Sequence, residues 1–111
     1  MDIDLRWKTY MPRELIKEIL AEENPDAYIY DGADEAILGL IYFDTGPVLA
    51  YSYSAYINMF VERDEMSLED AVEFFDFNVA GLHLGEHQPI IVDDTYIIVE
   101  NIEYEGVEEE N

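Results

Sequence analysis

His83, Glu86 and His87 are the residues whose types and spacing first point to chemistry. Together they match H-x-x-E-H, a signature of one class of zinc peptidase. The pattern works on a continuous helix, where residues four apart share a face and both imidazoles reach one zinc ion. Here Gly85 lies inside the motif and Pro89 follows it, and both residue types end helices. We therefore expect two loop histidines in an acidic region and no metal site.

Carboxylates are the second group that could carry chemistry, since the chain has 27 acidic residues and 5 basic ones. Two carboxylates held close together can perform acid–base catalysis or bind Mg²⁺ or Ca²⁺. However, the sequence has no EF-hand spacing, no G-x-S-x-G, no P-loop and no cysteine. In so acidic a chain, clusters also arise by chance. We expect no enzymatic activity and no cofactor, although five carboxylates fall in expected turns: Asp31, Asp34, Glu35, Asp93 and Asp94.

The charge is large and unevenly distributed. The formal net charge is −22, and Arg63 is the only basic residue after Lys17. Such a field repels nucleic acid and anionic membranes and attracts basic protein surfaces. The longest apolar run, residues 36–43, is too short to span a bilayer, and no signal-peptide layout precedes it. We expect a cytoplasmic protein whose partner is a basic, nucleic-acid-binding protein, with no direct contact to nucleic acid or membrane.

Length and pattern predict the elements that must position these groups. At 111 residues and 50% hydrophobic, the chain fits one domain, which we place at 1–104 with an acidic tail at 105–111. The order of elements predicts an α+β fold, a mostly antiparallel sheet packed by two or three helices. The expected helices cover 12–23, 55–64 and 68–80, and the expected strands cover 27–30, 36–43, 48–53, 89–92 and 96–104.

Several local signals set these boundaries. Pro12 suits the first turn of a helix, and two serines, Ser54 and Ser67, are expected to cap the next two helices. The turn at 44–47 contains Gly and Pro and predicts a hairpin between the strands on either side. A helix over 34–43 remains an alternative, because acidic residues at 34 and 35 could begin one.

The helix at 68–80 is the most informative element. At 100° per residue its apolar stripe is Leu68, Ala71, Val72, Phe75 and Val79, and a neighbouring stripe is acidic: Glu69, Glu73 and Asp76, with Asp70 beside it. Phe74 and Phe77 lie away from the apolar stripe. Either both rings pack under another element, or they form a contact surface of apolar anchors surrounded by charge.

The stretch "ERDEMSLEDAVEFFDFNVAGLHLGEHQP" resembles a group of small uncharacterised proteins common in bacteriophage genomes. The similarity covers roughly residues 30–90, and His83 and His87 fall outside its pattern. It implies a phage origin and an accessory role, and it brings no activity. The matching positions are Glu62, Arg63, Asp64, Met66, Ser67, Glu69, Ala71, Phe74, Phe75, Phe77, Asn78, Gly81, Gly85, Glu86 and Pro89.

Charge and resemblance together predict a phage-type inhibitor that mimics nucleic acid. It would occlude the basic groove of a host nuclease, CRISPR effector or DNA-repair protein from within the host cytoplasm. An alternative is an accessory or assembly protein whose acidity is an adaptation to a saline solvent. The oligomeric state is left open, with a homodimer among the options. The expected partner-binding residues are Glu62, Asp64, Glu65, Glu69, Asp70, Glu73, Phe74, Asp76 and Phe77.

Overall fold

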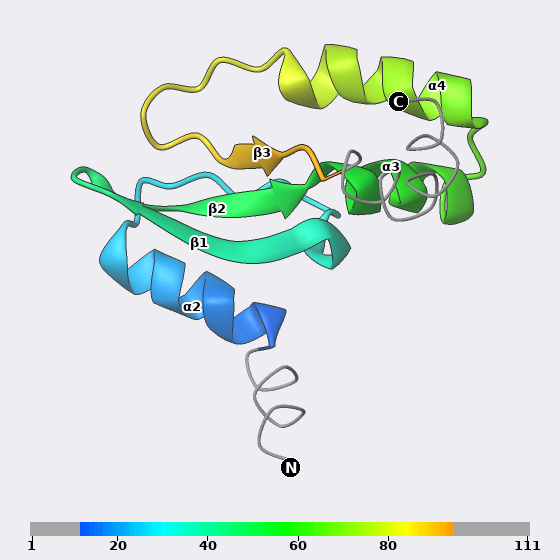
Figure 1. Ribbon diagram of the computed structural model, residues 1–111. Coiled ribbons are helices and arrows are strands. Elements are labelled where there is room, and N and C mark those ends of the chain that lie inside the picture. The colour runs from blue at the N-terminus through cyan, green and yellow to red at the C-terminus, as the bar shows by residue number, and fades with distance from the viewer. Residues whose placement is uncertain (1–11, 95–111) are drawn as a thin grey trace, which may run out of the picture.

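The computed structural model describes residues 12–94, which form a three-stranded sheet with helices around it (Figure 1). Strand β1 (Ile37–Phe43) pairs antiparallel with β2 (Gly46–Ser52), and the tight turn between them makes the predicted hairpin. Strand β3 (Ile90–Val92) lies on the other side of β2 and runs parallel to it. The sheet is therefore mixed but mostly antiparallel, and the predicted α+β fold is confirmed.

Three α-helices surround this sheet within the described residues. Helix α2 (Arg13–Glu23) packs against β1 and β2. Helix α3 (Tyr53–Glu62) follows β2 directly, and α4 (Leu68–Phe75) packs against α3 beyond the end of the strands (Figure 1). A 3-10 turn, Asp34–Ala36, leads into β1, and a π-helical turn, Asp76–Ala80, extends α4. The sequence therefore builds a sheet with one helix on a face and two at its end.

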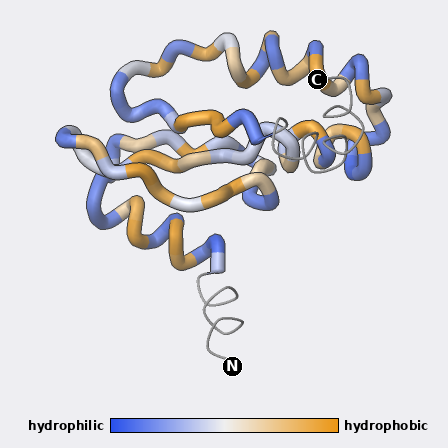
Figure 2. Tube along the Cα trace, in the orientation of Figure 1, coloured by the Kyte–Doolittle hydropathy of each residue, from blue (hydrophilic) through white to orange (hydrophobic). Residues whose placement is uncertain are grey.

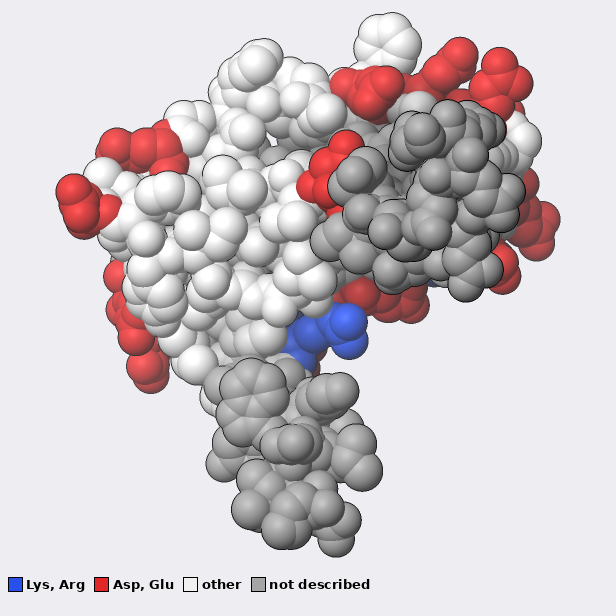
Figure 3. Space-filling view, viewed as in Figure 1, with Lys and Arg blue, Asp and Glu red and all other residues white. Residues whose placement is uncertain are grey.

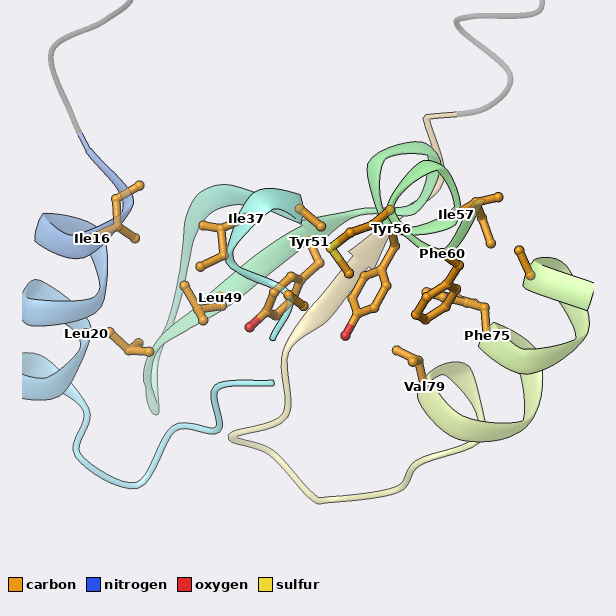
Figure 4. Close-up of a cluster of buried hydrophobic side chains, with 14 residues drawn as sticks. Ile16, Leu20, Ile37, Leu49, Tyr51, Tyr56, Ile57, Phe60, Phe75 and Val79 are labelled. Carbon is orange, nitrogen blue, oxygen red and sulfur yellow. The ribbon is translucent and has the colours of Figure 1, made fainter. Parts of the chain in front are cut away.

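The core runs from α2 across the sheet to α4 (Figure 4). At one end Ile16 and Leu20 pack with residues of the sheet, and hydrophobic residues concentrate on the strands and on α3 (Figure 2). At the other end the core is aromatic, with ring centroids 5.7 Å apart for Tyr51–Tyr56 and 5.2 Å for Tyr56–Phe75. These edge-to-face and tilted contacts hold α3 and α4 to the sheet.

The predicted strand at 27–30 is wrong. This segment is extended but joins no ladder, because its backbone N–H groups have other acceptors. The Tyr30 N–H donates to the Tyr51 hydroxyl at 2.9 Å, and the Tyr28 N–H donates to the His87 carbonyl at 3.3 Å. Burial raises the pKa of Tyr51 to about 12, so its hydroxyl stays protonated at neutral pH. The expected strand at 96–104 and the tail at 105–111 lie outside the described residues.

The helix starts were predicted with mixed success. Ser67 caps α4, since its hydroxyl accepts from the Asp70 N–H at 3.1 Å. The predicted cap at Ser54 is wrong, because α3 begins two residues earlier and Ser52 accepts from the Ala55 N–H at 3.0 Å. The earlier start lets the Tyr53 ring pack on α4. The alternative helix at 34–43 is limited to the 3-10 turn before β1.

Candidate interaction surface

The structure brings the nine expected partner-binding residues to one corner of the molecule. They belong to the end of α3, the loop after it, and α4 with the start of its π turn, and every one is exposed. Figure 3 shows carboxylates gathered at this end of the molecule. We call these residues the acidic corner: Glu62, Asp64, Glu65, Glu69, Asp70, Glu73, Phe74, Asp76 and Phe77.

The π turn at the end of α4 determines where Phe77 lies. The Asp76 N–H still bonds to the Glu73 and Val72 carbonyls, but the next residues follow a wider turn. Val79 is buried there, whereas 83% of Phe77 is exposed. Gly81 ends the turn, and a Cβ at that position would lie 3.1 Å from the Phe77 carbonyl oxygen. The core therefore holds one side of this turn and leaves the Phe77 ring in solvent.

Phe74 packs against α3 on one side and is exposed on the other. Its ring meets that of Phe60 edge-on, with centroids 5.2 Å apart, yet 43% of the residue remains exposed. Among residues 12–94, Phe74 is thus partly covered by α3, whereas Phe77 is mostly exposed, so the expectation that both rings pack under another element does not hold for Phe77. They border a shallow groove of about 450 Å³ lined by Met66, Asp70, Glu73, Phe74, Phe77 and Asn78.

Within residues 12–94, only one carboxylate of the acidic corner has a basic partner. Arg63 Nε lies 3.2 Å from Asp64 Oδ1, and the hydrogen bond to Asp64 is the main reason why the pKa of Arg63 is raised. The other six carboxylates of the corner form no ion pair with a described Lys or Arg. Their charge is therefore available to an incoming basic surface.

All three basic residues among residues 12–94, Arg63 included, also make hydrogen bonds to one other segment of the chain. Arg13 Nη2 donates to the Glu35 carbonyl at 3.1 Å, and Lys17 Nζ lies 2.8 Å from Asp34 Oδ2. Arg63 Nη1 donates to the carbonyl of Gly32 at 2.7 Å. All three cations therefore converge on the segment 32–35. The sequence analysis missed this anchor, although the spacing of 13 and 17 places two bases on one face of α2.

Glu65 adopts a conformation that usually requires glycine. Its φ is 61°, in the left-handed region, and the Met66 N–H returns to the Phe60 carbonyl at 3.0 Å. This hydrogen bond spans six residues and closes the chain reversal after α3, and the left-handed conformation within it is one that Gly adopts most readily. The chain thus keeps a carboxylate in the acidic corner at a position where a side chain costs conformational energy.

The H-x-x-E-H segment is not helical. His83 is exposed in an irregular stretch, and His87 lies in a turn with Nδ1 3.2 Å from Asn24 Nδ2 and Nε2 3.7 Å from Glu86. Nowhere in residues 12–94 do three or more His, Cys, Asp or Glu side chains gather as a metal site would require. The five turn carboxylates do not converge either: for example, Asp34 pairs with α2, and Asp94 bonds to the start of α3.

Comparison with known proteins adds no relative. No protein-family model, no curated protein and no solved structure matches the chain. The resemblance to phage proteins thus stays a prediction. No helix in the described part of the chain has the length and apolar character needed to cross a bilayer.

Proposed function

We propose that this protein is a small phage-encoded inhibitor that mimics nucleic acid and binds a basic host protein. The acidic corner would enter the groove of a nuclease, a CRISPR effector or a DNA-repair enzyme in the host cytoplasm and exclude the natural substrate by occupying its site. The protein performs no chemistry in this role, and it needs no cofactor.

The observation that carries the proposal is the exposure of Phe77 among carboxylates of which six form no ion pair with a Lys or Arg of residues 12–94. An aromatic ring that is 83% exposed gains free energy when a partner covers it. Unpaired carboxylates around the ring supply attraction at longer range and favour a partner of opposite charge. Adaptation to a saline solvent explains surface acids, but it gives no reason to expose a large apolar ring among them.

The spacing of the acids suits a groove that normally binds a phosphate backbone. Glu69, Glu73 and Asp76 follow one another at intervals of four and three residues, which is a rise of about 6 Å and then about 4.5 Å along the helix axis. The helix fixes these intervals, because Ser67 caps its first turn and the buried Phe75 holds its inner face. Lys and Arg side chains placed for successive phosphates would meet a row of carboxylates instead.

The test is affinity capture with two matched variants. The full chain is immobilised and exposed to host lysate at low salt, and bound proteins are eluted with molar salt and identified by mass spectrometry. One variant neutralises the acidic corner (E69Q, E73Q and D76N), and the control neutralises three exposed acids at α2 (E18Q, E22Q and D26N). Both remove the same number of charges, so a difference between them reports the surface and not the net charge.

We expect the wild-type protein and the α2 variant to retain one nucleic-acid-binding enzyme that the acidic-corner variant loses. That enzyme, once purified, should lose its nucleic-acid binding as the wild-type protein is added. If both variants capture the same proteins as the wild type, or if only scattered basic proteins appear, the acidic corner is a solvated surface and the proposal is wrong.

A further inference from the structure

A pocket of about 340 Å³ lies where the segment 29–33, helix α3 and the π turn after α4 meet. Its wall includes the rings of Phe60 and Phe74, which meet edge-on with centroids 5.2 Å apart. Smaller apolar side chains complete much of the wall, among them Ala33, Met59, Val79 and Leu82. The pocket is therefore mainly apolar, and its volume is near the lower end of the range found for small-molecule sites.

The hydroxyl of Tyr56 is the polar group that distinguishes this pocket. Tyr56 lines the pocket and is only 4% exposed. Figure 4 shows its hydroxyl oxygen directed away from α3, on the side where Val79 lies. It forms no hydrogen bond with any of residues 12–94, whereas the hydroxyl of the neighbouring Tyr51 accepts from the Tyr30 N–H at 2.9 Å. A buried hydroxyl without a partner is costly, so this group favours a molecule that can bond to it.

The Tyr56 hydroxyl can serve as a hydrogen-bond donor to such a molecule. Burial raises the pKa of Tyr56, so the hydroxyl keeps its proton at neutral pH. Two other polar residues of the wall already donate within the chain: Arg63 Nη1 to the Gly32 carbonyl at 2.7 Å, and Asn78 Nδ2 to the Phe74 carbonyl at 3.1 Å. A ligand that meets the unused donor of Tyr56 must carry an acceptor, such as a carbonyl oxygen.

We propose that this pocket binds a small neutral molecule with an aromatic body and a carbonyl oxygen that accepts from Tyr56. The apolar wall covers the body of the ligand, and the rings of Phe60 and Phe74 favour an aromatic one. An anion is disfavoured because the net charge of the chain is −22, and a cation meets the guanidinium of Arg63 in the wall. A neutral ligand avoids both kinds of repulsion.

This inference is independent of the proposed function. The pocket and the acidic corner have only Phe74 in common, and the Tyr56 hydroxyl is no part of the acidic corner. Capture of a host protein tests the acidic corner, and binding of a small molecule tests the pocket. Either result can fail while the other stands.

The test is a titration of the full chain with a small-molecule probe, followed by NMR of the side-chain methyl groups. The probe is acetophenone, an aromatic ring with a ketone, and its matched control is ethylbenzene, which has a similar shape without the oxygen. The methyl groups of Met59, Val79 and Leu82 report on the pocket. Those of Ile16 and Leu20, at the other end of the core, report effects outside it (Figure 4).

Two variants form a matched pair, since each removes one buried tyrosine hydroxyl and keeps the ring. Y56F removes the hydroxyl that faces the pocket, and Y51F removes the one that bonds to the Tyr30 N–H. Y56F should fold like the wild type, because the hydroxyl it removes has no partner within residues 12–94. Circular dichroism confirms the folding of each variant.

We expect acetophenone to shift the pocket methyl groups saturably in the wild type and in Y51F. Y56F should bind acetophenone about 3- to 10-fold more weakly, which corresponds to one neutral hydrogen bond, and should bind ethylbenzene as the wild type does. If the pocket methyl groups of the wild type do not respond to acetophenone, the inference is overturned whatever the variants do. It is also overturned if Y56F weakens the binding of both probes equally or of neither, since the hydroxyl then makes no bond to the ketone.

Discussion

The segments 31–36 and 62–76 are both rich in carboxylates, but their surroundings differ. In the first, three cations from α2 and the end of α3 converge, and Ala33 and Ala36 are buried in the core. In the second, Arg63 pairs with Asp64, the other carboxylates face solvent, and two phenylalanines are exposed. One carboxylate, that of Asp34, thus anchors the first region to α2, whereas six carboxylates of the second region form no ion pair with a Lys or Arg of residues 12–94.

The difference teaches that net charge alone does not identify a binding surface. Acids that are bonded to cations or to backbone donors are part of the fold, and replacing them changes stability. Acids without such bonds mainly generate the electrostatic field, and replacing them changes association. The distinction makes the following predictions, from the largest effect to the smallest.

Replacing a phenylalanine on the buried side of α4 and one on the exposed side should give the largest difference in the free energy of unfolding. Phe75 is 2% exposed and contacts two tyrosine rings, so F75A should lower the free energy of unfolding by about 3–5 kcal/mol. F77S removes a ring that is 83% exposed and should change stability by no more than about 0.5 kcal/mol. Urea unfolding of both variants measures the contrast. A loss of several kcal/mol in F77S would show that the ring has a structural role.

Asp94 is an acid that the fold uses, and its effect should depend on pH. It accepts from the Ser54 N–H at 2.8 Å and the Ser52 hydroxyl at 2.6 Å. Burial opposes the charge, but these hydrogen bonds prevail and hold the pKa of Asp94 below its usual value. Because the pKa of Asp94 is lower in the folded state than in the unfolded state, where it is near 4, the ionised carboxylate stabilises the fold above about pH 4. This stabilisation is lost as the pH falls through the folded pKa.

D94N should therefore lower stability by about 1 kcal/mol at neutral pH. The difference from the wild type should shrink at an acidic pH below the lowered folded pKa of Asp94, where the wild-type carboxyl is also protonated. Urea unfolding of D94N and the wild type at the two pH values measures the stability difference at each pH. E69Q serves as the control, because that residue has no described basic partner, and its effect at neutral pH should be smaller. Equal effects of D94N and E69Q would contradict the distinction between structural and solvated acids.

Glu65 belongs to the acidic corner but carries backbone strain. E65G should raise stability by a few tenths to about 1 kcal/mol, because glycine adopts the left-handed conformation without steric cost. E69G, the same change inside α4, should lower stability by about 1 kcal/mol. Thermal unfolding measures both. If E65G is also destabilising, the carboxylate makes a stabilising contact that outweighs the strain.

Arg63 connects the two regions, since it bonds both to Gly32 and to Asp64. R63Q should loosen the segment 31–36 and raise its amide exchange severalfold while leaving α2 protected. K17Q removes the ion pair between α2 and Asp34 of the same segment, and it is the matched comparison. Hydrogen exchange measured at individual amides tests this at Ala36, whose N–H bonds to the Ala33 carbonyl. If neither variant speeds exchange at Ala36, the cations do not anchor the segment.

Much of the fold follows from local signals in the sequence. Pro12 and the Asn24–Pro25 pair bound α2 as expected, and Ser67 begins α4, because these residues act through their immediate neighbours. The hairpin also follows from its turn. The segment 27–30 was misassigned because its backbone N–H groups donate to Tyr51 and His87, which are distant in sequence. A local sequence pattern cannot predict such distant partners.

The site was less predictable than the fold. A wheel at 100° per residue assumes an α-helix throughout, so the π turn at 76–80 and the final place of Phe77 could not be derived from it. Apolar residues on both sides of α4 left the exposure of the two rings undecided. The anchoring cations act across 17 to 31 residues of sequence, which makes them visible only once the chain is folded.

The placement of the three Lys and Arg side chains within residues 12–94 has a practical consequence for proteolysis. Trypsin cleaves after Lys and Arg, and within residues 12–94 it finds only Arg13, Lys17 and Arg63. Two of these lie in α2 and the third at the end of α3, and each holds the segment 32–35 by a hydrogen bond. A protease needs a locally unfolded strand, so native trypsin digestion should leave this part of the chain intact until it unfolds.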